Sequence, residues 1–395
     1  MQVRVRANDT LWYYSQLFLV PITLIIDSNP TVNPSALQVG GNVQIPGFTT
    51  ENYTIKKGDS LWNLATRRNL SVDALLLLNQ TINPNRLIIG ETILLPRRVI
   101  SPLTNRKTQY DFSLLTNDIN MLKEVYPFIR INRIGESVLG NPIQELVIGN
   151  GPKKVHMNSS FHANEWITSP ILMDNLNTFL LALTNGNTIR GLSSLPLYDE
   201  VTLSIVPMVN PDGVNLVLNG PPSNIREEIV NINKGSTDFT GWKANIRGVD
   251  LNNQFPAKWE IEKERKEEKA PAPRDYPGDA PLTEPEAIAM ANLARDRNFD
   301  RMLALHTQGE EFYWGYEGLE PNESRVLAEE FERVSGYQAI QYIDSYAGYK
   351  DWFIQEFRKP GFTMELGLGT NPLPLSQYEE IYEEFLGIFL ASLYM

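Results

Sequence analysis

The sequence contains no cysteine, few histidines and no long apolar run, and each shortage excludes a class of protein. Without cysteine, the 395 residues can form no disulfide, no thiolate metal site and no cysteine nucleophile. Any metal must therefore be held by imidazole and carboxylate groups, and only 3 histidines are available. The most apolar early stretch, residues 17–26, is interrupted by Pro21 and is shorter than the roughly 18 residues that a membrane helix needs. We expect no membrane insertion.

Positive charge is also scarce, with 35 lysines and arginines against 47 acidic residues and a net charge of -12. An acidic surface repels phosphate backbones and anionic lipids, so we expect no nucleic-acid partner. The segment from Met1 to Asp9 lacks the apolar core of a signal peptide. These features favour a cytoplasmic protein, or one that reaches the spore or cell wall by another route. The length predicts two or three domains.

The first hundred residues contain two copies of one unit, offset by 50 residues. The segment from Asp9 to Trp12 recurs as Asp59 to Trp62. Each copy predicts the order strand, helix, helix, strand, with Asp9 and Asp59 standing where a helix N-cap is expected. We therefore predict repeats at residues 1–48 and 51–98, followed by a third domain at 101–395.

Both repeats resemble LysM modules, most clearly in the segments from Gly58 to Trp62 and from Asn83 to Gly90. LysM modules bind N-acetylglucosamine glycans through the loop after the first strand and the loop before the second. The resemblance implies that seven residues of the second repeat contact the glycan: Gly58, Asp59, Ser60, Asn83, Pro84, Leu87 and Ile88.

The alternative is that the recurring residues serve only as caps and core. We favour this role for Leu61, Trp62 and Leu87, whereas for the loops we favour glycan binding. Asn8 stands where the second repeat has Gly58, which predicts weaker binding by the first repeat.

From about residue 100 onward, strand-like and helix-like segments alternate. Short apolar runs at 201–206, 302–305 and 362–366 predict buried strands, and residues 285–295 and 324–334 predict helices. This alternation predicts an α/β domain with helices on both faces of the sheet. The charged segment 258–269, which precedes a proline-rich stretch, is predicted to be a solvated insertion near the entrance of the site.

Two histidines and a glutamate form the candidate metal site. His162 and Glu165 are three residues apart, so on one helical turn both can reach the same ion. His306 ends an apolar run, and a strand would deliver it to the carboxyl edge of the sheet, where the sites of open α/β sheets lie. Three ligands leave one zinc position open, as catalytic sites require.

These residues occur within an ordered set of segments that resembles the zinc carboxypeptidase family. The set comprises Pro207 to Gly213, Asn245 to Asn253, His306 and Thr363 to Leu366. The resemblance implies a mixed-sheet α/β fold and one Zn²⁺ held by His162, Glu165 and His306, the ligand types of carboxypeptidase A. His156 matches no role in the family, and we expect it to be structural.

Three further roles follow from the same resemblance. Glu365 matches the catalytic glutamate that moves a proton between water and the leaving amine. Arg247 matches the arginine that stabilises the oxyanion, although it could instead form a surface salt bridge. A tyrosine lines the substrate pocket of the family, and of Tyr342 and Tyr346 we prefer Tyr346.

One departure from the family concerns the substrate. Asn252 matches a substrate-binding residue, but the next position holds Asn253 instead of the arginine that clamps a C-terminal carboxylate. A neutral amide cannot replace a bidentate guanidinium, so exopeptidase action is unexpected. LysM repeats joined to this catalytic family resemble bacterial endopeptidases that cut peptidoglycan stem peptides between D-glutamate and diaminopimelate.

We therefore predict a zinc-dependent peptidoglycan endopeptidase whose LysM repeats bind the glycan. One rival hypothesis is a zinc carboxypeptidase of general peptides that the repeats merely localise. Another is a non-catalytic glycan-binding protein, which the full set of His162, Glu165, His306 and Glu365 disfavours.

Overall fold

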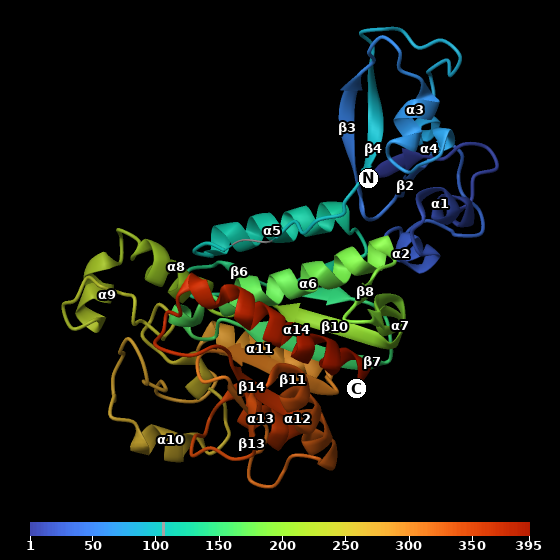
Figure 1. Ribbon diagram of the computed structural model, residues 1–395. Helices are drawn as coiled ribbons and strands as arrows, with labels where there is room; N and C mark the ends of the chain where they lie inside the picture. The colour runs from blue at the N-terminus through green and yellow to red at the C-terminus, as the bar shows by residue number, and fades with distance from the viewer. Residues whose placement is uncertain (105–106) are drawn as a thin grey trace. The chain divides into compact units, whose positions relative to one another are not determined.

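The computed structural model describes residues 1–104 and 107–395, and these form two compact units (Figure 1). The first unit contains residues 1–103, 118–130 and 177–196, and the second contains the remaining described residues. The first unit thus includes more than the two repeats, because parts of helices α5 (Phe112–Val125) and α6 (Thr168–Asn185) also belong to it. Among the described residues, no helix is long and apolar enough to cross a membrane.

Each repeat has the predicted order of strand, helix, helix and strand. In both, the two strands pair antiparallel, with Val3 opposite Val43 and Tyr53 opposite Ile93. The first repeat consists of β1 (Gln2–Arg4), α1 (Leu11–Phe18), α2 (Ile22–Asp27) and β2 (Asn42–Gln44). The second consists of β3 (Phe48–Thr54), α3 (Leu61–Thr66), α4 (Val72–Leu78) and β4 (Thr92–Arg98).

The N-caps of α1 and α3 lie one residue later than the sequence predicted. The side chains of Thr10 and Ser60, not those of Asp9 and Asp59, accept hydrogen bonds from the first helical turn. Asp59 instead accepts hydrogen bonds from the backbone N–H of Lys56 at 2.7 Å and from the Tyr53 hydroxyl at 2.9 Å. The aspartates therefore hold the turn that precedes each helix.

The prediction that Trp62 belongs to the core is wrong. Leu61 is buried as expected, but the Trp62 side chain is 66% exposed, and Trp12 of the first repeat is 63% exposed. The cause is helical geometry, since adjacent positions of α3 point in different directions and only Leu61, Leu64 and Ala65 face the strands.

The second unit is built on a mixed eight-stranded sheet with the strand order β13-β12-β14-β11-β7-β10-β6-β5. The central strands β10, β7, β11 and β14 are parallel, whereas β6 and β12 run antiparallel to their inner neighbours β10 and β14. The strands are β5 (Arg130–Glu136), β6 (Pro142–Ile148), β7 (Lys153–Ser159), β10 (Val201–Val206), β11 (Arg301–His306), β12 (Glu311–Tyr313), β13 (Gln338–Ile340) and β14 (Gly361–Glu365). The mixed sheet and the predicted strands at 201–206, 302–305 and 362–366 are confirmed.

Helices cover the sheet, and several short helices and strands lie within the connections between its strands (Figure 1). Met302 and Ala304 of β11 pack in one apolar cluster with side chains of α11 and α13. The predicted helices at 285–295 and 324–334 are confirmed as α11 and α12. The remaining elements are η1 (Ala163–Glu165), β8 (Thr188–Ile189), β9 (Leu192–Ser193), α7 (Ser194–Glu200), α8 (Pro211–Asn219), α9 (Arg226–Ile232), η2 (Leu251–Asn253), α10 (Trp259–Arg265), α11 (Pro285–Arg297), α12 (Asn322–Ser335), α13 (Tyr349–Phe357), η3 (Leu375–Gln377) and α14 (Tyr378–Tyr394).

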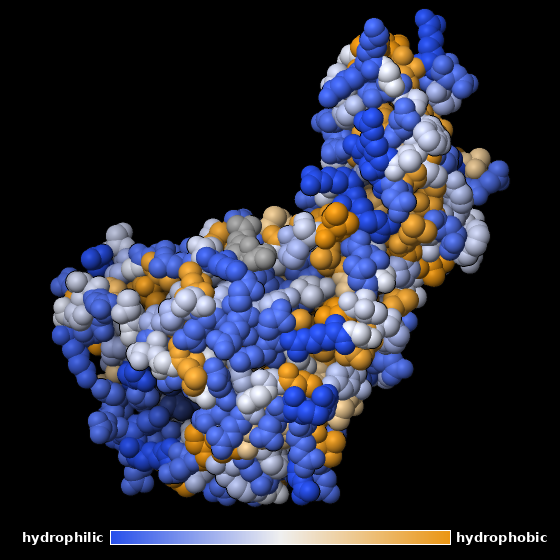
Figure 2. All heavy atoms as spheres, viewed as in Figure 1, coloured by the Kyte–Doolittle hydropathy of each residue, from blue (hydrophilic) through white to orange (hydrophobic). Residues whose placement is uncertain are grey.

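The charged segment predicted as an insertion forms α10, and it is not fully solvated. Trp259 and Glu262 are buried, and Glu262 forms ion pairs with Arg265 and Lys266. Figure 2 shows a hollow lined by hydrophilic residues beside this segment.

Candidate active site

The sharp turn after β7 presents His162 and Glu165 on one side. His162 precedes the single turn η1, and the backbone N–H of Glu165 donates to the His162 carbonyl at 3.3 Å. This turn places the His162 Nδ1 2.9 Å from the Glu165 Oε1. Both side chains are almost fully buried, at 5% and 3% exposure. The turn is anchored from behind, where Thr168 Oγ1 donates to the Glu165 carbonyl at 2.8 Å.

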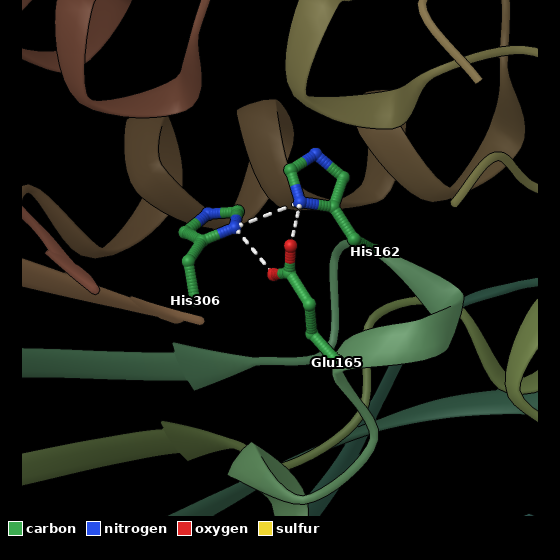
Figure 3. A group of neighbouring side chains, drawn as sticks. All are labelled: His162, Glu165 and His306. Atoms are coloured by element: carbon green, nitrogen blue, oxygen red, sulfur yellow. Dashed lines mark hydrogen bonds and ion pairs between the residues drawn. The ribbon is translucent and has the colours of Figure 1, made fainter. Parts of the chain in front are cut away.

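His306 is the last residue of β11, which is adjacent to β7 in the sheet. Its Nδ1 lies 3.0 Å from the His162 Nδ1 and 3.0 Å from the Glu165 Oε2. Figure 3 shows the three side chains pointing toward one another. The structure therefore brings together the three residues that the sequence suggested as metal ligands.

The geometry of this cluster fits a zinc ion. Two ring nitrogens that face each other at 3.0 Å can share at most one proton, whereas a cation between them satisfies both. Tetrahedral zinc with bonds of 2.0–2.1 Å places its ligand atoms about 3.3 Å apart, close to the separations in the cluster. The donors are two imidazoles and a carboxylate, which is a catalytic zinc ligand set.

Asp250, which the sequence analysis did not single out, orients His162 from the opposite side. Its Oδ1 lies 3.2 Å from the His162 Nε2, so the histidine can donate a proton there and keep Nδ1 free for the metal. Burial opposes ionisation, but Lys243 and His162 hold the pKa of Asp250 well below its usual value. Asp250 lies within the segment from Asn245 to Asn253, so the family resemblance already covered its position.

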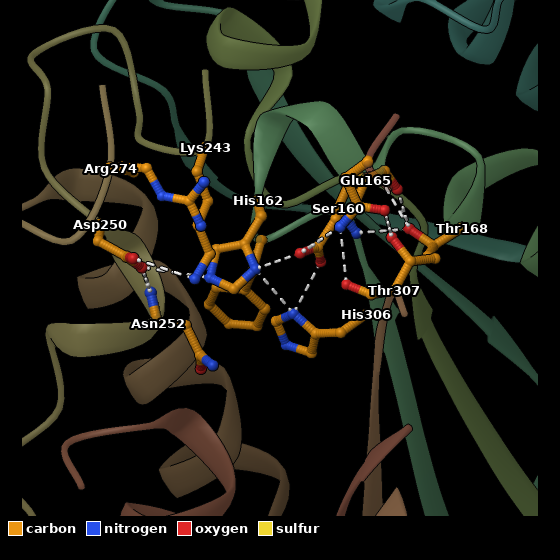
Figure 4. Close-up of polar contacts among 12 residues, drawn as sticks. Ser160, His162, Glu165, Thr168, Lys243, Asp250, Asn252, Arg274, His306 and Thr307 are labelled. Atoms are coloured by element: carbon orange, nitrogen blue, oxygen red, sulfur yellow. Dashed lines mark hydrogen bonds and ion pairs between the residues drawn. The ribbon is translucent and has the colours of Figure 1, made fainter. Parts of the chain in front are cut away.

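Lys243 is a second residue that the sequence analysis missed. Its Nζ lies 3.4 Å from the Asp250 Oδ2, and the pKa of Lys243 is raised against the effect of burial by Asp250 and Glu165. Figure 4 shows Lys243 and Arg274 beside His162. The backbone explains why they are neighbours, because the N–H groups of Lys243 and Ala244 both donate to the Pro273 carbonyl.

Arg247 is placed differently. Its side chain is 55% exposed, and it forms an ion pair with Glu284 at 3.4 Å. No hydrogen bond or ion pair joins Arg247 to His162, Glu165 or His306, all of which lie in the described part of the chain. Lys243 is therefore the cation that contacts the residues around the metal cluster.

Glu365 ends β14, directly opposite His306 in the parallel register. Burial and, to a lesser degree, the negative charge of Glu165 together raise the pKa of Glu365 to about 8. Burial also acts on Glu165, but His162 and His306 hold its pKa below the usual value. A bound divalent cation lowers the pKa of nearby carboxyl groups, which would favour the ionised form of Glu365.

Asn252 and Asn253 lie in η2, directly after Asp250. The Asn252 Oδ1 accepts a hydrogen bond from the Tyr349 N–H at 3.0 Å. Asn253 is 6% exposed, and its Nδ2 donates to the Asn252 carbonyl at 3.2 Å. The Oδ1 of Asn253 is buried and has no hydrogen-bond partner among the described residues.

The two candidate tyrosines line a hollow of about 600 Å³. The Tyr346 ring is half-buried, with the Lys258 ammonium 5.0 Å and the Arg265 guanidinium 5.3 Å from its centroid. The Tyr342 side chain is exposed and donates to Glu320 at 2.7 Å. Neither tyrosine contacts the metal cluster.

His156 does not join the cluster. It is buried in the middle of the central strand β7, with its Nδ1 3.1 Å from the Ser204 Oγ and its ring stacked on Phe299. Burial lowers the pKa of His156 to about 4, which is consistent with a neutral structural histidine.

The loops predicted to bind glycan are exposed and tightly structured. Gly58 adopts a φ of 91°, and Asn8 of the first repeat adopts a φ of 68°, so both turns use the same left-handed conformation. The Asn83 Oδ1 accepts from the Asn85 N–H at 3.0 Å, Pro84 is exposed, Leu87 is half-buried, and Ile88 is 62% exposed.

The sequence profile of zinc carboxypeptidases matches residues 115–386. The chain belongs to the zinc carboxypeptidase family. The chain therefore carries a zinc metallopeptidase domain, and residues 3–46 and 53–96 match the LysM domain. The chain is also 63% identical to gamma-D-glutamyl-L-diamino acid endopeptidase 1 of Lysinibacillus sphaericus, over the full length of both proteins.

Solved structures share the fold of this domain. Bovine thrombin-activatable fibrinolysis inhibitor superposes with a TM-score of 0.56 at 18% identity, over 73% of this chain and 96% of that one. Carboxypeptidase A from Helicoverpa armigera gives a TM-score of 0.55 at 18% identity, over 81% of this chain and 78% of that one. At these identities the likeness concerns the fold alone.

Proposed function

We propose that this zinc carboxypeptidase relative is a peptidoglycan endopeptidase that cuts the bond between γ-linked D-glutamate and diaminopimelate in stem peptides. The observation that carries the proposal is the 63% identity, over both full lengths, to an enzyme named for cleavage at a γ-D-glutamyl-L-diamino acid bond. The metal cluster and Glu365 supply the groups that such hydrolysis needs.

One Zn²⁺ per chain would be held by His162, Glu165 and His306. When bound, it supplies Lewis-acid polarisation of the scissile carbonyl and of the attacking water. Asp250 keeps His162 in the tautomer that this ligation requires, by accepting a hydrogen bond from the Nε2–H.

Glu365 acts as the general base and then as the general acid. It lies at the carboxyl edge of the sheet beside His306, so it can take a proton from the attacking water and pass it to the leaving amine.

Lys243, rather than Arg247, is the cation that we propose for stabilising the oxyanion. Lys243 lies against Asp250 next to the metal ligands, whereas Arg247 is paired with Glu284. A positive charge fixed beside a buried site stabilises the negative charge that develops on the carbonyl oxygen.

Asn252, Asn253 and Tyr346 are the proposed substrate contacts. Asn253 carries no charge, so this position lacks the cation that would clamp a C-terminal carboxylate. The enzyme should therefore accept stem peptides that continue beyond diaminopimelate. This is the behaviour of an endopeptidase and distinguishes it from the rival carboxypeptidase.

The LysM repeats are proposed to bind the N-acetylglucosamine glycan and keep the enzyme on the wall of the cell or spore. In the second repeat the contacts would come from Gly58, Asp59, Ser60, Asn83, Pro84, Leu87 and Ile88, of which Gly58, Asn83, Pro84 and Ile88 are exposed. Trp62 follows Leu61 in α3 and is exposed, so it can add an aromatic surface for the glycan.

Digestion of purified muropeptides tests the proposed activity. We expect fragments whose masses correspond to cleavage between D-glutamate and diaminopimelate, and we expect none from His306→Ala. Release of single C-terminal amino acids from ordinary peptides, with intact muropeptides, would favour the carboxypeptidase hypothesis instead.

A further inference from the structure

A groove lined by arginines lies in the second LysM repeat, apart from the loops assigned to the glycan. It has a volume of about 810 Å³, within the usual range for small-ligand sites. Its walls are the C-terminal end of α3 and the last residues of the β3–β4 ladder. Glu51 is the single acidic residue among its lining side chains. Four arginines line the groove: Arg67, Arg68, Arg97 and Arg98.

Two of these arginines have structural roles. Arg68 donates to the Leu64 carbonyl at 3.1 Å, which caps α3, and it forms an ion pair with Glu51. Arg98 donates to the Thr184 carbonyl at 3.1 Å, and its guanidinium lies 4.5 Å from the centroid of the Phe48 ring. The charge of Glu51 is thus already neutralised.

The other two arginines are unpaired. Arg67 and Arg97 are both exposed, and within the described part of the chain their side chains form no hydrogen bond or ion pair. A cation at the C-terminus of a helix interacts favourably with the helix dipole, which explains the presence of Arg67 without any ligand. It does not explain Arg97, which comes from β4, opposite Thr49, and faces the same groove.

The charge of the groove also contrasts with that of the whole chain. Acidic residues outnumber basic ones by 47 to 35, yet four arginines surround this one hollow. Guanidinium groups match the geometry of carboxylate and phosphate oxygens and bind them bidentately.

We propose that this arginine groove binds oxyanions, carboxylate or phosphate, carried by an anionic polymer of the cell wall. The inference that the anion comes from the cell wall rests on the proposed function, whereas the inference that the groove binds anions does not. Gly58 and Ser60 precede α3 and Arg67 follows it, so the groove and the glycan loop lie at opposite ends of a helix of about 9 Å. One repeat could hold a glycan strand and an anionic group together, which offsets the repulsion between an acidic protein and an anionic wall.

Binding of soluble polyanions to the full-length protein tests the proposal. Poly(glycerol phosphate) presents phosphate, poly-γ-glutamate presents carboxylate, and uncharged dextran is the blank. We expect at least one polyanion to bind, with an affinity that falls as salt rises. The double variant Arg67→Glu with Arg97→Glu should weaken that binding about tenfold or more. The polymer that binds identifies the source of the anion.

A matched variant controls for overall charge. Lys57→Glu with Arg86→Glu also exchanges two exposed cations for two anions in the same repeat, but neither residue lines the groove. We expect its affinity for the polyanion to stay within about threefold of the wild type. Equal weakening by both double variants, or no binding of either polymer by the wild type, would overturn the proposal. Binding is measured without peptide cleavage, so the result stands even if the proposed peptidase activity is absent.

Discussion

Replacing Asp250 with asparagine should weaken zinc binding while leaving the fold intact. The asparagine can still accept the hydrogen bond that the Asn252 N–H donates at 3.1 Å, so η2 keeps its cap. The substitution removes the charge that faces the His162 Nε2 at 3.2 Å and the Lys243 ammonium at 3.4 Å. Loss of such a partner typically costs 10–100-fold in metal affinity, or about 1.4–2.7 kcal/mol.

The assay is competition for zinc between the protein and a chelator of known affinity, at a pH where the histidine is neutral. Asp344→Asn serves as the matched control, because Asp344 is an exposed acid paired with Arg265 at 2.7 Å. The control should bind zinc as the wild type does, and both variants should keep the wild-type melting temperature. If Asp250→Asn binds zinc within about twofold of the control, Asp250 does not orient His162.

Three further predictions concern the base, the cation and a buried acid. Glu365→Gln should keep zinc but lower turnover by roughly 10²–10⁴, because it removes the proton acceptor. Lys243→Met should lower kcat by about 10²–10³, whereas Arg247→Met should have little effect. Burial raises the pKa of Glu286 to about 7, so its contribution to stability should be lost as pH rises from about 4.5 to 7. Glu286→Gln should remove this pH dependence, which is on the order of 3 kcal/mol.

Each of these predictions has a contrary outcome. Near-normal turnover of Glu365→Gln with zinc bound would assign the base to another residue. A larger kcat loss in Arg247→Met than in Lys243→Met would return the oxyanion role to Arg247. Urea unfolding at several pH values measures the Glu286 effect, and identical pH profiles for variant and wild type would show that the Glu286 pKa is ordinary.

The sequence predicted the elements whose pattern is local. The apolar runs that became β10, β11 and β14 could be read from composition alone, because buried parallel strands are continuously apolar. The position of His306 followed from this, since it ends such a run and parallel strands bring their ends to one edge, whereas Glu365 was identified by the resemblance to the family.

Contacts between distant segments could not be predicted in this way. Lys243 reaches the site because its backbone pairs with Pro273, thirty residues further along the chain. Arg247 likewise forms an ion pair with Glu284, which comes from a distant segment of the chain. The spacing of residues within 245–253 does not reveal this contact. Trp62 was misjudged for a local reason, since a single turn of α3 decides which side of the helix faces the strands.

The measurement that tests the central claim most directly compares two synthetic stem peptides. One is the tripeptide L-Ala-γ-D-Glu-diaminopimelate, and the other carries a further residue after diaminopimelate. With Asn253 in place of a carboxylate-binding arginine, we expect cleavage at the γ-glutamyl bond of both, with kcat/KM values within about tenfold. Cleavage of the tripeptide alone, or removal of only the last residue from the longer peptide, would contradict the endopeptidase assignment.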